Sequence, residues 1–235
     1  MKDGLTELVF ILDRSGSMRG LENDTIGGFN SMIEKQKAEE GEAFVTTVLF
    51  DDKYEMLHDH VLINSVGELT SREYYARGMT ALLDAVGRTI NSVGERLANT
   101  PEDERPEQVI FVITTDGFEN ASREFKKKQV REMIEHQQTK YSWTFMFLGA
   151  NMDAVSEAES LGIDSSFAKT YTNSAACLDS LYSGVSNSIS AMRAYNASSA
   201  SFADEDSGLD ETAVKANRMA RAKAFASATL KSEVK

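Results

Sequence analysis

The 235-residue sequence contains one cysteine, two prolines and three histidines. Cys177 has no partner for a disulfide within the chain, so nothing here requires an oxidising compartment. With so few prolines and a hydrophobic content of 41%, the composition is not that of a disordered or fibrous chain. The length suffices for one sizeable hydrophobic core. We therefore expect one domain, residues 1–196, followed by a linker and an Ala-rich, basic helical tail over residues 197–235.

Basic residues are fewer than acidic ones, 25 against 37, so the formal net charge is −12 at pH 7. Such a chain repels nucleic-acid backbones and anionic membrane surfaces. No apolar run approaches the roughly 20 residues that span a bilayer, and the run near the amino terminus is too short for a signal peptide. We therefore expect a cytoplasmic protein whose partner is neither nucleic acid nor membrane. The oligomeric state does not follow from the sequence.

One apolar run ends abruptly in oxygen-bearing side chains. Residues 8–12, Leu-Val-Phe-Ile-Leu, predict a strand buried on both faces, as in parallel sheets under helices. Asp13 follows at the carboxyl end of this strand, where open α/β sheets bind their ligands. Ser15 and Ser17 can turn back beside Asp13 because Gly16 permits a tight bend. Oxygen ligands alone favour a hard cation such as Mg2+ or Mn2+, with Ca2+ as a third option.

Two other segments supply matching oxygens. Thr80, in Gly-Met-Thr-Ala-Leu, places a hydroxyl just before a helical pattern, and residues 109–115 form a second buried strand that ends at Asp116. Each segment has a plainer interpretation: an Asx turn at Asp13, a helix cap at Thr80 and a turn at Asp116-Gly117. Their joint occurrence at the ends of predicted strands favours a shared site.

Asp-x-Ser-x-Ser, a distant Thr in Gly-x-Thr-Ala-Leu, and Thr-Asp-Gly after a strand, in this order, resemble the metal-ion-dependent adhesion site (MIDAS) of the von Willebrand factor type A (vWA) family. The resemblance covers residues 5 to 196 and is to the stand-alone bacterial or phage type. It implies an α/β fold: a doubly wound, mostly parallel central sheet with one antiparallel edge strand and helices on both faces. The metal-coordinating positions that it implies are Asp13, Ser15, Ser17, Thr80 and Asp116.

Hydrophobic periodicity gives the expected order of elements. Residues 43–51 and 54–63 form a hairpin that supplies the antiparallel edge strand. Further strands are expected at 109–115, 143–148 and 166–171, and helices at 24–40, 80–97, 123–138, 153–161 and 174–195. By resemblance to the family, the helix over 174–195 moves when ligand engages the metal site.

The donor set suggests a function. Hydroxyls of Ser15, Ser17 and Thr80 are neutral ligands, so the ion stays electrophilic and can accept a carboxylate from another protein. We therefore expect a metal-dependent adaptor whose partner presents Asp or Glu, and no enzyme. A metal-assisted hydrolase and a structural module with an unused metal site remain alternatives. A serine hydrolase would need Gly-x-Ser-x-Gly and a histidine base, and neither accompanies the motif.

Three other features have simpler interpretations. Arg14, inside the first motif, is expected to project to solvent or to steer anionic ligands. The Asp51-Asp52 pair is typical of a turn and predicts one here. His58 and His60 are two apart on a predicted strand, which places both imidazoles on one face. A transition-metal clip there would lack a third ligand, so a solvated edge strand is favoured.

Overall fold

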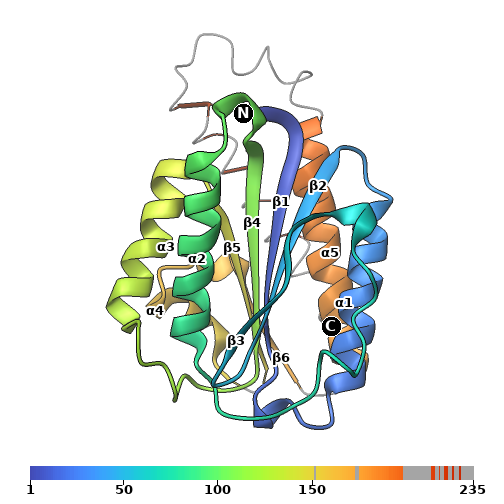
Figure 1. Cartoon of the computed structure of the whole chain (residues 1–235), viewed down its shortest axis with the longest axis vertical. Helices are drawn as coiled ribbons and strands as arrows, with labels where there is room; N and C mark the ends of the chain where they lie inside the picture. Colours follow the sequence, from blue (N-terminus) through green and yellow to red (C-terminus); the bar gives the residue numbers. More distant parts are fainter. Residues whose placement is uncertain are drawn as a thin grey trace.

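The computed structural model describes residues 1–150, 152–172 and 175–197, together with single helical positions between 213 and 228. Its centre is a six-stranded sheet in the order β3-β2-β1-β4-β5-β6 (Figure 1). The strands are β1 (Lys2–Asp13), β2 (Glu42–Phe50), β3 (Tyr54–Leu62), β4 (Pro106–Thr115), β5 (Thr144–Ala150) and β6 (Ala168–Tyr171). All neighbouring strands run parallel except β2 and β3. The predicted doubly wound sheet with one antiparallel edge strand is confirmed.

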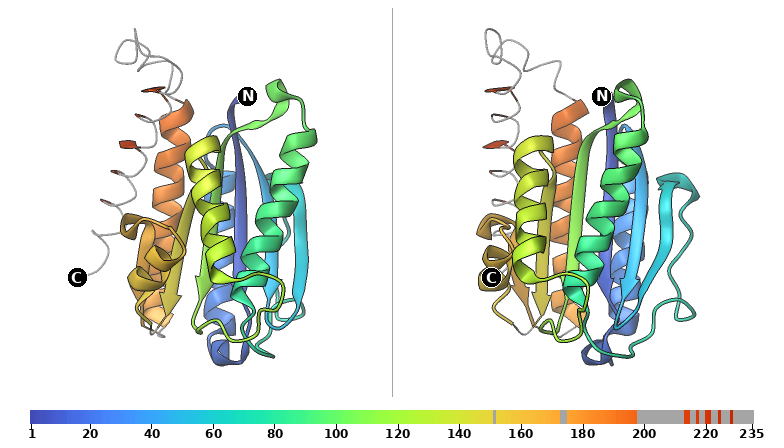
Figure 2. Two further views of the ribbon diagram at one scale, coloured as in Figure 1. Left: turned by 90° about the vertical axis from the view of Figure 1, so that its left-hand side faces the viewer. Right: turned by 60° about the vertical axis from the view of Figure 1, so that its left-hand side comes forward.

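Helices cover both faces of the sheet, as Figure 2 shows from two sides. The helices are α1 (Glu22–Lys37), α2 (Leu82–Asn99), α3 (Lys127–Tyr141), α4 (Ala154–Ser160) and α5 (Ala175–Ala197). Helices α1 and α5 pack together on one face, and α2 and α3 lie on the other. The predicted tail beyond α5 lies outside the described residues, apart from the single positions named above. Within the described part, no helix is long and apolar enough to cross a membrane.

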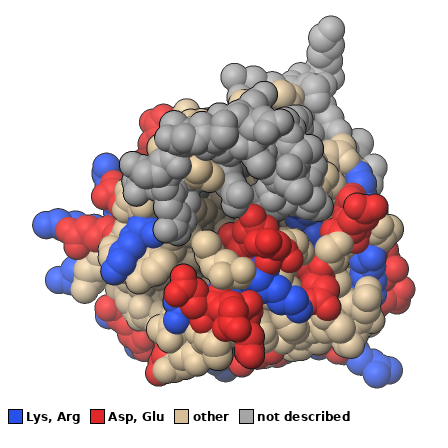
Figure 3. All heavy atoms as spheres, turned by 90° about the horizontal axis from the view of Figure 1, so that it is seen from above, with Lys and Arg blue, Asp and Glu red and all other residues tan. Residues whose placement is uncertain are grey.

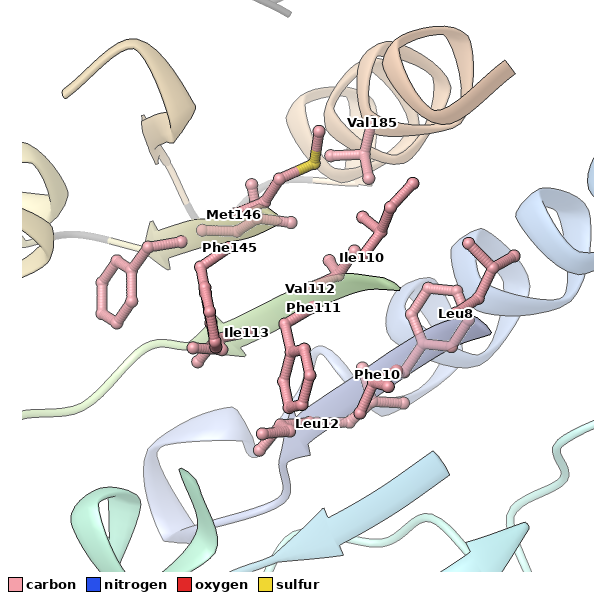
Figure 4. Packing of buried hydrophobic residues seen from close by; sticks show 14 of the residues in the cluster. Leu8, Phe10, Leu12, Ile110, Phe111, Val112, Ile113, Phe145, Met146 and Val185 are labelled. Carbon is pink, nitrogen blue, oxygen red and sulfur yellow. The ribbon is translucent and has the colours of Figure 1, made fainter. Parts of the chain in front are cut away.

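The core forms because the central strands are apolar on both faces. Residues of β1 alternate between the two helical layers: Phe10 meets Phe29 of α1 edge-on, with ring centroids 5.4 Å apart. Figure 4 shows the side chains of β1, β4 and β5 filling the space under the helices, with Val185 of α5 near Met146. A continuous apolar core of this kind fixes the strand ends rigidly.

The ends of β1 and β4 define the functional edge. The two strands are parallel neighbours, and Leu12 is in register with Thr114. Because parallel strands end at the same edge, the residues that follow Asp13 and Thr115 must lie side by side. Helix α2 also begins at this edge, the lower one in Figure 1. The predicted motif segments therefore meet at one place.

Candidate functional site

Asp13 is buried, with 1% of its surface exposed, and both oxygens of its carboxyl group accept hydrogen bonds. Its Oδ1 accepts a hydrogen bond from the Ser15 amide at 2.6 Å, and its Oδ2 accepts one from Thr115 Oγ1 at 2.6 Å. Burial raises the pKa of this carboxyl from 3.8 to about 6, although these hydrogen bonds act in the opposite direction. The Tyr74 hydroxyl donates to the Asp13 carbonyl. Among the residues that the structure describes, none forms an ion pair with this buried carboxyl, so its charge is not compensated there.

Three hydroxyl oxygens converge beside Gly117. A Cβ atom built on this glycine would lie 2.9 Å from Thr80 Oγ1, 3.2 Å from Ser17 Oγ and 3.8 Å from Ser15 Oγ. Ser15 Oγ and Ser17 Oγ are 3.0 Å apart. Because Gly117 has no side chain, a small space remains beside its Cα atom. Hydroxyl groups from two different loops surround this space.

Asp116, which directly follows β4, joins the same cluster. Its Oδ1 accepts a hydrogen bond from Ser17 Oγ at 2.5 Å, and its charge contributes to the raised pKa of Asp13. The structure thus brings together all five residues that the sequence singled out, with Asp13, Ser15 and Thr80 buried and Ser17 at the surface.

Backbone hydrogen bonds connect the three loops directly. The Gly16 amide donates to the Gly78 carbonyl at 3.2 Å, which joins the first loop to the second. The Thr80 amide donates to Asn120 Oδ1 at 2.9 Å, and the Asn120 amide donates to the Thr80 carbonyl at 3.0 Å. Asn120 was not identified from the sequence, because nothing local shows that it reaches a residue 40 positions away.

The loop after β4 also caps helix α2. Glu119 Oε2 accepts from the Leu83 amide at 2.9 Å, and Ser122 Oγ accepts from the Asp84 amide at 3.0 Å. These two side chains satisfy amides that a helix start leaves without partners. The segment serves this purpose instead of extending α3, so the predicted helix start at 123 is wrong and α3 begins at Lys127.

Arg14 does not project to solvent, and that prediction is wrong. Its side chain is buried, with Nε 3.2 Å from Asp51 Oδ2 and a terminal nitrogen 2.6 Å from Glu55 Oε2. Another terminal nitrogen donates to the Glu73 carbonyl at 3.0 Å. Arg77 Nε reaches the same Asp51 oxygen at 2.6 Å. Arg14 therefore ties the loop that bears Ser15 and Ser17 to the β2–β3 turn.

Asp51 does more than form a turn. Its Oδ1 accepts from the Lys53 amide at 2.7 Å, as a turn residue should, but its side chain is fully buried. Burial alone would raise the pKa of Asp51. The hydrogen bonds from Arg77 and Lys53, together with the charges of Arg14 and Arg77, outweigh burial and hold the pKa below its ordinary value.

The two histidines of β3 do not act as a pair. His60 has a positive φ of 53°, and the register between β2 and β3 shifts nearby. Its Nδ1 lies 2.6 Å from the buried Glu7 carboxylate, and its ring stacks on Phe44. His58 instead pairs in register with Thr47. The backbone irregularity breaks the two-residue alternation on which the prediction of a shared face depended.

The donor chemistry of the cluster fits a hard divalent cation. Two carboxylates, Asp13 and Asp116, and three hydroxyls, those of Ser15, Ser17 and Thr80, meet at one strand edge. Oxygen-only sets of this kind suit Mg2+, Mn2+ or Ca2+. Among the described residues there is no group of three or more His, Cys, Asp or Glu side chains that could hold a metal. Any ion at this edge would therefore depend on hydroxyl ligands.

No protein-family model matches the sequence, and a search of curated proteins found no match. The fold is similar to proximal thread matrix protein 1 from the mussel byssus, solved with a zinc-occupied MIDAS motif, at a TM-score of 0.54 and 17% identity. That match covers 78% of this chain and 45% of the mussel protein, so the chain spans less than half its length.

Two bacterial structures are similar in the same way. The vWF domain of the type V pili tip protein Mfa5 from Porphyromonas gingivalis matches with a TM-score of 0.54 and 11% identity, over 79% of this chain and 96% of that domain. The von Willebrand factor type A structure from Catenulispora acidiphila gives 0.52 and 13%, over 77% and 41% of the two chains. Identities this low establish the fold and leave function to the site. The chain has the vWA fold that its sequence motifs indicated.

Proposed function

We propose that this chain is a divalent-metal-dependent protein-binding module that captures an acidic side chain of a partner protein. The convergence of three hydroxyls beside Gly117, with Asp13 and Asp116 adjoining, carries the proposal. We infer Mg2+ as the ion, with Mn2+ or Ca2+ as substitutes. The zinc-occupied MIDAS motif of the mussel protein supports a divalent ion in this fold.

The five residues divide into two roles. Ser15, Ser17 and Thr80 would offer neutral oxygens to the ion, and Asp13 and Asp116 would supply negative charge. When bound, the ion supplies a Lewis-acidic position open to an external carboxylate. The protein contributes a rigid cradle, because Ser15 and Thr115 hold the Asp13 carboxyl from both sides. Such preorganisation lowers the entropic cost of binding.

The net charge of −12 disfavours the approach of an acidic partner to the surface in general. Figure 3 looks onto the end opposite the site, where Asp and Glu side chains lie among Lys and Arg side chains over the described part of that face. The short turn Glu102–Glu104 has the sequence Glu-Asp-Glu and all three residues are exposed. Like charges repel at such a surface. A cation at the opposite edge would attract an acidic partner more strongly than this end of the molecule does.

Binding to an immobilised glutamate-containing peptide, measured in Mg2+ and in EDTA, tests this function. We expect retention in Mg2+, release by EDTA and loss in Asp116→Ala, whereas Asp3→Ala, which removes an exposed acid of β1, should bind like the wild type. Retention that EDTA does not change would contradict the proposal. Metal-dependent turnover of a phosphoester or ester that requires Asp13 would favour the hydrolase instead.

A further inference from the structure

Large apolar side chains stand exposed on the loops that build the metal site. Phe118 is 67% exposed, Met79 is 52% exposed and Tyr75 is 43% exposed. We call these three residues the apolar rim. Scattered exposed apolar residues need no explanation, but several around one site indicate a surface that binds something.

Two rim residues directly adjoin the cradle. Phe118 follows Gly117, and Met79 precedes Thr80, whose hydroxyl lies 2.9 Å from the Gly117 Cβ position. Consecutive Cα atoms are about 3.8 Å apart, so both side chains originate within one residue of the cradle. A ligand carboxylate in the cradle would therefore have its own neighbouring residues near Phe118 and Met79.

Tyr75 is held in place by arginine. Arg77 donates to the Tyr75 hydroxyl at 2.7 Å, and its guanidinium carbon lies 5.1 Å from the ring centroid. Arg14 lies at 5.7 Å from the same centroid. Contacts at these distances are cation–π interactions that fix the ring. The ring therefore stays partly exposed while its orientation is set.

The backbone beneath the rim is ordered by hydrogen bonds on both sides. Met79 lies between the Gly78 carbonyl, which accepts from Gly16, and the Thr80 amide, which donates to Asn120. Beside Phe118, the Gly117 amide donates to Thr115 Oγ1 at 3.2 Å. The side chains of Met79 and Phe118 are therefore exposed although the backbone that carries them is held by hydrogen bonds. Apolar side chains on a fixed backbone bind with a smaller loss of entropy.

We infer that the partner presents its Asp or Glu within an apolar segment, so that the carboxylate enters the metal site and the flanking large apolar residues cover the apolar rim. This inference rests on the proposed function, because it places the partner's acid at the same site. The ion would select for charge. Phe118, Met79 and Tyr75 would select for the residues beside that charge.

Two labelled peptides that share one glutamate test the inference. One is Gly-Leu-Glu-Leu-Gly and the other Gly-Ser-Glu-Ser-Gly, both blocked at their ends, and fluorescence anisotropy in Mg2+ gives each Kd. We expect the leucine peptide to bind about tenfold more tightly, because its side chains bury apolar area. Phe118→Ser should remove most of that difference. Tyr141→Ser replaces another aromatic residue, 51% exposed at the end of α3, and should keep the difference.

The possible outcomes distinguish a failure of this inference from a failure of the proposed function on which it rests. If both peptides bind in Mg2+ with equal Kd, or if Phe118→Ser keeps the tenfold difference, the apolar rim does not select the partner and only the inference fails. If neither peptide binds, or binding survives EDTA, the proposed function itself fails. Sedimentation of the wild type and Phe118→Ser without peptide covers one more case. A wild-type dimer that this substitution dissociates would mean that a second copy occupies the rim, and would overturn the inference.

Discussion

Arg14 and Asp51 form an ion pair in which both side chains are buried, with 3.2 Å between Arg14 Nε and Asp51 Oδ2. Arg14 lies between Asp13 and Ser15, and Asp51 follows β2 directly. The pair therefore joins the loop after β1, which bears the proposed metal ligands Ser15 and Ser17, to the neighbouring β2–β3 turn. Since Arg77 also bonds Asp51 at 2.6 Å, the same carboxylate also anchors the segment that leads to Thr80.

Replacing Arg14 with Met should lower the free energy of unfolding by about 3 kcal/mol, because the buried Asp51 carboxylate loses one of its two cationic partners. Urea unfolding measures this. Arg19→Met removes an exposed arginine nearby and should change stability by less than about 0.5 kcal/mol. Equal effects of the two substitutions would show that the buried ion pair has no special importance.

Asp13→Asn should change how stability depends on pH. In the metal-free protein the pKa of Asp13 is raised from 3.8 to about 6, so the folded state holds a proton that the unfolded state has already lost. Stability should therefore fall as pH rises from about 4 to 6, and the variant should lack this part of the slope. Near pH 7 the metal-free variant should be more stable than the wild type by up to about 3 kcal/mol.

Mg2+ provides the control for that prediction. It should stabilise the wild type and leave Asp13→Asn unchanged, because only the ionised carboxylate attracts the cation. Thermal unfolding at several pH values, with and without Mg2+, gives both results. Identical pH profiles for the two proteins would contradict the assigned role of the Asp13 carboxyl.

Ligand engagement should also alter helix α5. Tyr182 of α5 packs so closely on Gly28 of α1 that a Cβ on the glycine would lie 2.1 Å from the ring, so α5 cannot shift without changing this contact. The family resemblance implies that ligand engagement moves this helix, so a glutamate peptide with Mg2+ should change amide exchange in residues 175–197, and Thr80→Ala should abolish the change. Exchange differences confined to the loops that bear Asp13, Thr80 and Asp116 would indicate a rigid adaptor.

The sequence predicted the sheet well, because its evidence is local. The apolar run that ends at Asp13 and the one that ends at Thr115 each describe a strand buried on both faces. The short turn between residues 51 and 54 likewise predicts the hairpin of β2 and β3. Strand ends then bring the site residues together without further information, since parallel neighbours finish at one edge.

The failures all concern contacts between distant segments. Arg14 is buried because its guanidinium pairs with the carboxylate of Asp51, 37 residues later. The sequence around Arg14 gives no sign of this ion pair. Helix α3 begins at Lys127 and not at the predicted residue 123, because the preceding segment is used to cap α2 through Glu119 and Ser122. His60 lies off the expected face where the β2–β3 register shifts, and its Nδ1 is 2.6 Å from the carboxylate of Glu7, 53 residues earlier. Local pattern cannot show any of these three contacts.

The most direct test of the metal site is a calorimetric titration of Mg2+ into Gly117→Ala. The added Cβ would lie 2.9 Å from Thr80 Oγ1 and 3.2 Å from Ser17 Oγ, so it would occupy the space that the hydroxyls surround. Gly27→Ala is the matched control, because its Cβ meets nothing within 4 Å. We predict one Mg2+ site in the wild type and in Gly27→Ala, and at least about tenfold weaker binding in Gly117→Ala, with stability lowered by no more than about 1 kcal/mol. Undiminished Mg2+ binding by Gly117→Ala, or no binding by the wild type, would contradict the claim that these residues form a metal site.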